Sequence, residues 1–210
     1  MESTLRDTCP HDLRVIETFG AGPDGMPRWP AHRARLIVTC ARLGIVPDLE
    51  LVDAAVAVLD VFVPMRVRLT VDLTGGLNVE AVPVGKTPDQ WRIGLADHVV
   101  HADDPWFTVK TTHREIYDSA RAALPNGLDE VVFVNQSGFV SEGTITNVFV
   151  QKGDILLTPA LSNGVLPGIL RAELLNDGRA QEAQLRWANV LAAEDVFVGN
   201  SLRGLIRAVV

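Results

Sequence analysis

Lys110 is the residue of this sequence whose position most suggests covalent chemistry. It follows the mostly apolar run 106–109 and precedes a helix-like segment. A lysine that is partly desolvated loses its proton more easily and can form a Schiff base with a carbonyl group. The alternative, commoner for an arbitrary lysine, is a side chain at a strand end that reaches water. The position of Lys110 leaves both interpretations open.

A Schiff-base lysine that serves pyridoxal 5'-phosphate (PLP) needs an anion site for the phosphate and a group beside the pyridine nitrogen. Glu142, in SEGTITN, is a carboxylate in a β-rich region, where it could keep that nitrogen protonated or simply face solvent. The segment GVLPGILR at 164–171 offers a helix start with two glycines, and Arg35 offers a cation. Backbone N–H groups at a helix start and an arginine are typical phosphate ligands.

The composition indicates a folded chain and argues against binding to nucleic acid or to membranes. Of the 210 residues 47% are hydrophobic and 21% are charged, and the net charge is −7 without a basic cluster. The longest apolar run, 51–65, is interrupted by Asp53 and Asp60, so no membrane span is expected. Two cysteines, Cys9 and Cys40, are too few for a disulfide framework, and their spacing is not that of metal ligands. Because no signal peptide is evident at the start, we expect a cytoplasmic protein.

Hydrophobic periodicity and turn residues predict mixed strands and helices in two halves, an α+β fold. At residues 66–73, for example, polar and apolar residues alternate as in a half-buried strand. We expect a small α/β domain at 1–102 and a larger β-rich domain at 103–210, divided at the connector HADDP. The expected helices lie at 30–43, 47–59 and 112–124 and from 166–168 onward, and the expected strands at 13–19, 66–73, 77–84, 91–95, 106–109, 131–135, 139–145, 147–151, 155–159, 195–198 and 206–210.

The order of these motifs along the chain resembles the class IV PLP-dependent aminotransferases, also called fold type IV. This family includes branched-chain aminotransferases, D-amino-acid aminotransferases and 4-amino-4-deoxychorismate lyases. The resemblance rests on ETF at 17–19, HRARL at 32–36, KTTHREIY at 110–117, SEGTITNVFV at 141–150, LLTP at 156–159, GVLPGILR at 164–171 and GNSLRGL at 199–205. It covers nearly the whole chain and implies a two-domain, D-amino-acid aminotransferase-like fold.

The resemblance implies a role for each candidate residue. Lys110 would carry PLP and act as catalytic base, and Glu142 would bind the pyridine nitrogen. Arg35 would hold the phosphate together with the backbone N–H groups of Ile169 and Leu170. The remaining implied residues are Ser201 in the phosphate cup, Thr146 and Asn147 at the cofactor ring, Thr18 in proton transfer and Arg114 at the substrate.

Departures from the family pattern favour one activity over the others. The opening strand and the glycine-rich segment that usually precede ETF are absent, and Leu170 replaces a threonine usual in transaminases. Gly75 and Gly76 stand where D-amino-acid enzymes place a carboxylate-binding Arg and His, and Glu115 replaces the tyrosine of branched-chain enzymes. Arg114 and NSLRGL instead resemble the lyases.

We therefore expect a PLP-dependent 4-amino-4-deoxychorismate lyase of folate synthesis, acting on a small-molecule substrate and, by resemblance, as a homodimer. The alternatives are an aminotransferase acting on a branched-chain or other small amino acid, and a non-catalytic binding subunit of the same fold. The intact set Lys110, Glu142 and Arg35 argues against the non-catalytic alternative.

Other polar residues have structural explanations. His32 lies one helical turn before Arg35 and is expected to cap or pack the helix. Asp53 and Asp60 are expected on a solvent face, and Tyr117 and Trp106 in the core or a pocket wall. His98, His101, Asp103 and Asp104 could suggest a metal site, but their position in a connector favours a solvated loop. No metal is expected.

Overall fold

The computed structural model describes residues 5–210, which divide into two compact units. The first unit runs to Lys86 and includes the short segment Val109–His113. The second unit consists of Thr87–Thr108 and Arg114–Val210. Each unit has its own sheet.

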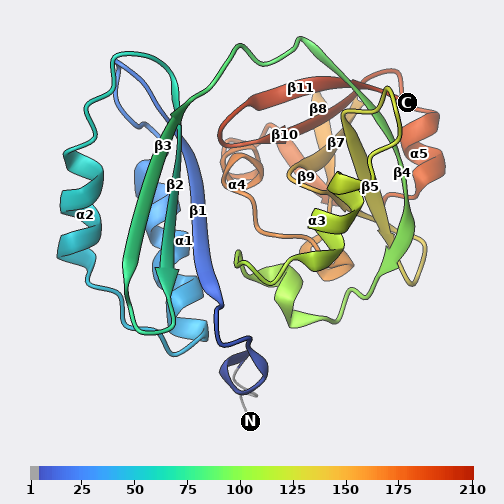
Figure 1. The fold of residues 1–210 in the computed structure, drawn as a ribbon. Helices are drawn as coiled ribbons and strands as arrows, with labels where there is room; N and C mark the ends of the chain where they lie inside the picture. The colour runs from blue at the N-terminus through green and yellow to red at the C-terminus, as the bar shows by residue number, and fades with distance from the viewer. Residues whose placement is uncertain (1–4) are drawn as a thin grey trace. The chain divides into compact units, whose positions relative to one another are not determined.

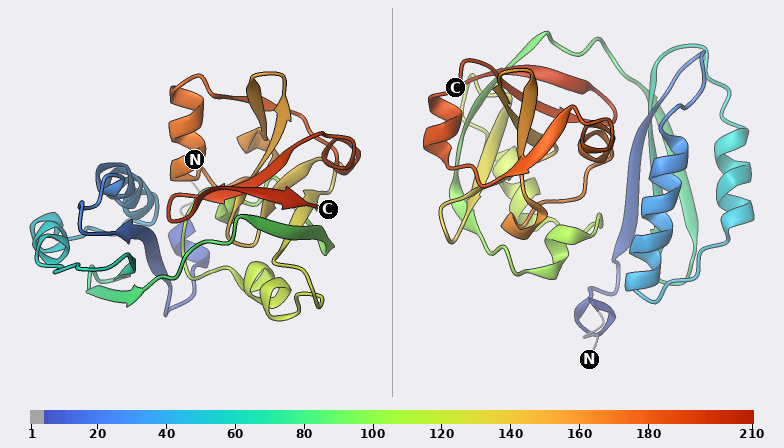
Figure 2. Two further views of the ribbon diagram at one scale, coloured as in Figure 1. Left: turned by 90° about the horizontal axis from the view of Figure 1, so that it is seen from above. Right: turned by 180° about the vertical axis from the view of Figure 1, so that it is seen from behind.

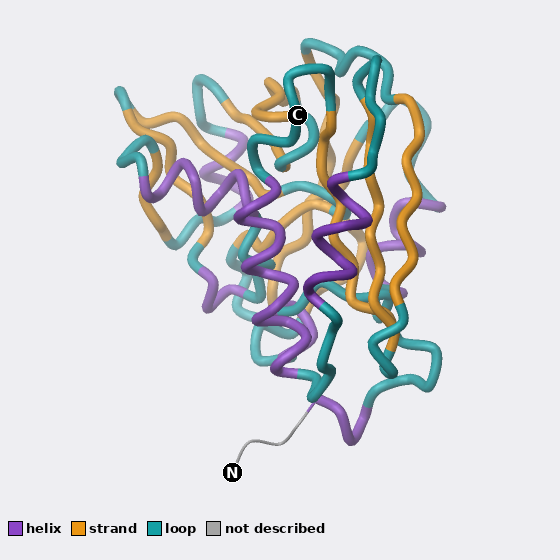
Figure 3. The backbone as a smooth tube through the Cα atoms, turned by 90° about the vertical axis from the view of Figure 1, so that its left-hand side faces the viewer, coloured by secondary structure: helices purple, strands orange, loops and turns teal. Residues whose placement is uncertain are grey.

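The first unit is a three-stranded antiparallel sheet with helices packed on it (Figure 1). The sheet has the order β1–β2–β3, and Glu17 of β1 pairs with Leu69 of β2. Figure 3 shows the two longer helices side by side in front of the strands. The elements are η1 (Leu5–Thr8), β1 (Arg14–Ala21), α1 (Trp29–Arg42), α2 (Leu49–Ala57), β2 (Met65–Asp72) and β3 (Leu77–Pro83).

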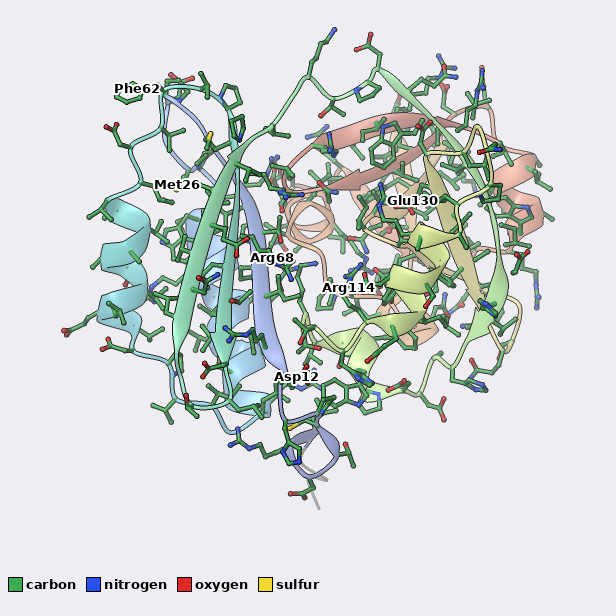
Figure 4. All side chains as sticks on the ribbon, viewed as in Figure 1. Asp12, Met26, Phe62, Arg68, Arg114 and Glu130 are labelled. Carbon is green, nitrogen blue, oxygen red and sulfur yellow. The ribbon has the colours of Figure 1, made fainter. Side chains whose placement is uncertain are left out.

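The alternation of buried and exposed side chains along the strands explains why helices pack on this sheet. Val67, Leu69 and Val71 of β2 are fully buried, whereas Arg66 and Arg68 point to the other face. Figure 4 labels Arg68 on this sheet. α2 begins at Asp48, whose carboxylate accepts a hydrogen bond of 2.9 Å from the Leu51 N–H.

The second unit is built on one eight-stranded sheet with the order β6–β5–β4–β11–β10–β7–β8–β9. β4 runs parallel to both β5 and β11, while β10 is antiparallel to β11 and β7. The strands are β4 (Gln90–Val100), β5 (Glu130–Asn135), β6 (Val140–Gly143), β7 (Asn147–Lys152), β8 (Ile155–Pro159), β9 (Ala180–Ala183), β10 (Val196–Asn200) and β11 (Gly204–Val209).

The sheet curls, since its edge strand β6 also contacts β7 and β8. Inside it lies a core that includes Val132, Val148 and Val198, all fully buried. α3 (Glu115–Ala122) packs on β5, and α4 (Ile169–Asn176) packs beside β9 and β10 (Figure 2). The remaining short helices are η2 (Pro105–Thr108), η3 (Leu161–Asn163) and α5 (Trp187–Leu191).

The division between the units differs from the boundary expected at residues 102 and 103. β4 forms its hydrogen bonds with β5 and β11, so it belongs to the second unit. The break falls in the irregular segment 84–89 instead, and Lys110, expected in the larger domain, belongs to the first unit. The connector HADDP joins two elements of the same unit.

Several elements differ from their sequence-based expectations. The expected strand at 106–109 is the 3-10 helix η2, because Pro105 and the hydrogen bond from the Thr108 hydroxyl to the Pro105 carbonyl favour a turn. The expected strand at 139–145 ends at Gly143, where a turn begins. The sequence analysis did not identify β9 or α5.

No helix within residues 5–210 is long and apolar enough to cross a membrane.

Candidate active site

The backbone around Lys110 is clamped to the edge of β1. The Ile16 N–H donates to the Lys110 carbonyl at 2.9 Å, and Val15 and Thr111 form an isolated antiparallel bridge. The Thr112 N–H donates to the Arg14 carbonyl at 2.8 Å. Because backbone bonds hold both sides of Lys110, its position along β1 is fixed.

Thr18 lies on the same strand, two residues beyond Ile16 and therefore on the same face of the sheet. Its partner across the sheet is Arg68 of β2. Glu17 projects to the opposite face, where it is completely buried. Thr18 and Glu17 therefore lie on opposite faces of the three-stranded sheet.

A buried ionic cluster connects Glu17 with α1. Arg35 binds Glu17 with both ends of its guanidinium, from Nε to Oε1 at 2.9 Å and from Nη2 to Oε2 at 2.7 Å. His32 places Nδ1 2.6 Å from Glu17 Oε2 and is itself fully buried. The geometry orients the guanidinium of Arg35 in the two-point manner typical of Arg–carboxylate pairs.

The charges of this cluster shift its pKa values. Burial raises the pKa of Glu17, but the Arg35 charge and the hydrogen bonds from His32 and Arg35 outweigh it, and the pKa is lowered overall. Burial also lowers the pKa of His32, with Arg35 and Lys110 acting in the same direction against Glu17. We conclude that Glu17 is ionised and that His32 is neutral near pH 7.

In the second unit, two side chains hold the carboxylate of Glu142. Tyr117 donates its hydroxyl proton to Glu142 Oε1 at 2.6 Å, and Asn147 Nδ2 donates to Oε2 at 3.1 Å. Glu142 is only 6% exposed. A buried carboxylate with a hydrogen-bond donor on each oxygen is favoured in its ionised form.

Asn147 also connects Glu142 with the start of α4. Its Nδ2 donates to the Leu166 carbonyl at 3.2 Å, and a Cβ on Gly168 would come within 1.9 Å of Asn147 Oδ1. Gly168 is the N-cap of α4 and makes no side-chain capping bond. The first N–H groups of the helix, those of Ile169 and Leu170, therefore lie at an end without a side-chain cap.

These features fit the cofactor that the sequence predicts. A buried carboxylate that accepts a hydrogen bond on each oxygen suits a protonated pyridine nitrogen, and an uncapped helix start suits a phosphate. Both occur in the second unit, connected by Asn147.

Glu130 at the start of β5 organises the turn 143–146 that precedes Asn147. Its carboxylate accepts hydrogen bonds from the Thr144 N–H at 3.0 Å, the Ile145 N–H at 3.2 Å and the Thr146 hydroxyl at 3.1 Å. The Thr146 hydroxyl is thus directed toward Glu130. Glu130 was not identified from the sequence, although a carboxylate directly before the apolar run 131–134 was an available signal.

Arg114 lies at the N-terminus of α3, as Figure 4 shows together with Glu130. Its Nη2 donates to the Thr144 carbonyl at 2.9 Å and its Nε to Asp118 at 2.8 Å. The guanidinium also stands over the Tyr117 ring, 5.3 Å from the centroid. These contacts place Arg114 beside the turn 143–146.

Ser201 lies in the turn between β10 and β11. Asn200 shapes this turn, since its Oδ1 accepts the Leu202 N–H at 3.1 Å and the Arg203 N–H at 3.0 Å. Asn200 Nδ2 donates to the Ile145 carbonyl at 3.1 Å, which connects the turn with 143–146.

The candidate residues therefore form two sets. Lys110, Thr18 and Arg35 belong to the first unit. The second unit contains Arg114, Glu142, Thr146, Asn147, Ile169, Leu170 and Ser201. The sequence analysis treated His32 and Tyr117 as packing residues. In the structure each is also hydrogen-bonded to a carboxylate, His32 to Glu17 and Tyr117 to Glu142.

Other polar residues of the described chain were candidates for a metal site or a solvent-exposed face. No group of three or more His, Cys, Asp or Glu within residues 5–210 could hold a metal ion. Asp53, expected on a solvent face, is partly exposed and pairs with Arg33 of α1, with Nε 2.7 Å from Oδ1.

The family model for class IV amino-transferases matches residues 14–209, almost the whole chain. The chain belongs to the class IV aminotransferase family. The expected fold type IV, α+β architecture is thereby confirmed.

Two curated relatives of this chain carry aminodeoxychorismate lyase names. The "Putative aminodeoxychorismate lyase" of Schizosaccharomyces pombe is 30% identical over 152 residues, which are 69% of this chain and 66% of the relative. The aminodeoxychorismate lyase of Saccharomyces cerevisiae is 24% identical over 192 residues, covering 69% of this chain and 51% of the relative. The chain thus spans between half and two thirds of the length of these two proteins.

Solved structures of class IV proteins superpose over nearly the whole chain. A "Putative amino-acid aminotransferase" from Mesorhizobium loti is 37% identical with a TM-score of 0.87, covering 94% of this chain and 99% of that one. A hypothetical aminotransferase from Mycobacterium tuberculosis in its PLP-bound form shares the fold at 22% identity, with a TM-score of 0.79, covering 93% of this chain and 80% of that one.

Proposed function

We propose that this class IV protein is a PLP-dependent 4-amino-4-deoxychorismate lyase, which releases p-aminobenzoate and pyruvate in folate synthesis. The observation that carries the cofactor assignment is the Glu142 carboxylate, buried and held through both oxygens. The lyase assignment is supported by the names of the two yeast relatives and by Arg114 and Glu115 at positions where the family motifs differ between activities.

In this proposal each candidate residue has the role that its family motif implies. Lys110 carries the cofactor, and Glu142 accepts a hydrogen bond from the protonated pyridine nitrogen. Arg35, Ser201 and the N–H groups of Ile169 and Leu170 bind the phosphate, while Thr146 and Asn147 support the ring. Arg114 contacts the substrate.

When bound, PLP supplies an electron sink for negative charge at the carbon that bears the substrate nitrogen. Lys110 would be the general base that removes the proton from that carbon. Thr18 or Lys110 returns a proton to the departing enolpyruvyl group, which leaves as pyruvate. Loss of pyruvate makes the ring of the product aromatic, and Lys110 would then hold the cofactor again.

The buried cluster of Glu17, His32 and Arg35 orients the Arg35 guanidinium before an anion binds. Glu17 engages Nε and one side of Nη2, which fixes the plane of the guanidinium. A preoriented guanidinium loses less side-chain entropy when it binds a phosphate.

An aminotransferase is the second candidate, and the Mesorhizobium loti structure favours it, because it matches this chain over 99% of its own length. A transaminase needs a keto acid to regenerate the cofactor, whereas the lyase does not. The test is therefore an assay of the purified, PLP-loaded protein with aminodeoxychorismate. Release of p-aminobenzoate without any keto acid would support the lyase, and release only with a keto acid, or none, would contradict it.

We also propose a cytoplasmic homodimer, as the family resemblance implies. Light scattering coupled to size-exclusion chromatography measures the mass directly, and 22.8 kDa would be the monomer.

A further inference from the structure

Tyr117, the only tyrosine of the chain, makes its hydrogen bond to a charged group in the interior of the second unit. Its hydroxyl lies 2.6 Å from Glu142 Oε1. This distance is within the range of about 2.5–2.7 Å for hydroxyl donors to ionised oxygens, which are stronger than neutral pairs. This hydrogen bond therefore holds the Glu142 carboxylate in place.

The ring of Tyr117 is held in place by two aromatic neighbours. It meets Phe107 edge to face at 5.8 Å between centroids and Phe133 at 5.4 Å, with interplanar angles of 87° and 86°. Phe133 is completely buried. This arrangement fixes the direction in which the hydroxyl points, since edge-to-face packing on two sides resists rotation of the side chain.

Burial, together with two neighbouring carboxylates, keeps Tyr117 protonated. Burial raises the pKa of Tyr117 well above 10, and the negative charges of Glu142 and Asp104 add to the shift. Arg114, whose guanidinium faces the ring, opposes it. The phenol is therefore a hydrogen-bond donor at every pH at which the protein is expected to work.

We propose that Tyr117 is a positioning residue that acts through Glu142 on the pyridine nitrogen of the cofactor, an inference that rests on the proposed function. Two donors, Tyr117 and Asn147, set the plane of the Glu142 carboxylate and favour its ionised form. An ionised carboxylate keeps the proton on the ring nitrogen. Tyr117 thus supports the electron sink without touching the substrate.

The contact can be tested in the apoprotein, because a single tyrosine gives a single tyrosinate absorbance. Titration to alkaline pH should show Tyr117 ionising well above 10. Glu142→Gln removes the charge but retains an acceptor, so the midpoint should fall. The same midpoint in wild type and in Glu142→Gln would overturn the contact, and this measurement needs no cofactor.

The role of Tyr117 is tested with Tyr117→Phe, which keeps the ring and its packing. Loaded with PLP, this variant should lose its ring-nitrogen proton at a lower pH than wild type, visible in the cofactor absorbance. Its kcat should fall on the order of 10-fold with little change in KM, as expected for a lost bond to a charged group. Phe139→Leu, which changes an aromatic ring of the same unit that contacts Arg186, is the matched control.

Two further comparisons separate positioning from general damage. In a Glu142→Gln background, Tyr117→Phe should cause no additional loss, since both changes act through one group. With a PLP analogue whose ring nitrogen is replaced by carbon, wild type and Tyr117→Phe should be equal. An additive loss, or a loss that persists with the analogue, would overturn the positioning role. A protein that binds PLP but releases no p-aminobenzoate would contradict the lyase alone, because the absorbance shift remains measurable.

Discussion

A Cβ on Gly168 would lie 1.9 Å from the Oδ1 of Asn147, so the start of α4 and the side chain that holds Glu142 are in direct contact. Only glycine fits at this position without displacing Asn147. The contact couples the uncapped helix start to the buried carboxylate.

Gly168→Ala should therefore destabilise the protein and weaken PLP binding together. Overpacking of this kind costs about 1–3 kcal/mol of the free energy of unfolding. Urea denaturation and PLP titration measure the two effects. Gly85→Ala is the control, because a Cβ there meets nothing within 4 Å. Equal stability of the two variants would show that Asn147 moves aside freely.

Arg35→Ala should weaken PLP binding more than it changes the chemistry. Loss of a hydrogen bond to a charged group costs about 1.5–3 kcal/mol, or roughly 10- to 150-fold in the dissociation constant. Arg33→Ala, on the same helix, removes a surface ion pair with Asp53 and should leave PLP binding unchanged. If wild type and Arg35→Ala bind PLP equally, Arg35 is not a phosphate ligand.

The Glu17 and His32 pair should make the stability of the protein depend on pH. Both pKa values are lowered in the folded state, so the unfolded chain binds more protons. The free energy of unfolding should fall as the pH drops below 6.5, the ordinary value for His, and further below 4.5, the ordinary value for Glu.

Urea denaturation at a series of pH values checks this dependence. Glu17→Gln should remove the part of the dependence that lies below pH 4.5 and destabilise the protein by about 3–5 kcal/mol, since Arg35 and His32 lose their buried partner. The part due to His32 should remain, because Glu17 acts to raise the pKa of His32. Exposed Glu50→Gln is the control. A wild-type stability that is flat between pH 7 and pH 4 would contradict the assignment.

The sequence suggested candidate site residues, but it did not reveal the residues that support them. The motif order placed Lys110, Glu142 and Arg35, while Glu17, Glu130 and Tyr117 emerged only from contacts between segments distant in the chain. No local pattern shows that Tyr117 and Glu142, 25 residues apart, are hydrogen-bonded. The strand expected at 106–109 shows the same limit, because its apolar residues fit a 3-10 turn equally well.

Borohydride treatment of the yellow, PLP-loaded protein should attach the cofactor irreversibly to one peptide, the one that contains Lys110. The prediction follows from the family motif at 110–117 and from the backbone hydrogen bonds that hold the chain around Lys110 beside β1. Peptide mass spectrometry identifies the site. Labelling of Lys86 or Lys152, the other two lysines, would contradict it.

The last prediction separates lyase from transaminase by the fate of the cofactor. A lyase begins and ends its cycle with PLP, because the product amine leaves by exchange with Lys110. A transaminase must leave the nitrogen on the cofactor. Gly75 and Gly76 replace the carboxylate-binding residues of D-amino-acid enzymes, and Glu115 replaces the tyrosine of branched-chain enzymes. Common L- and D-amino acids should therefore bleach little of the PLP absorbance. Rapid bleaching by one amino acid, reversed by a keto acid, would favour the aminotransferase and leave the proposed roles of Lys110, Glu142 and Arg35 unchanged.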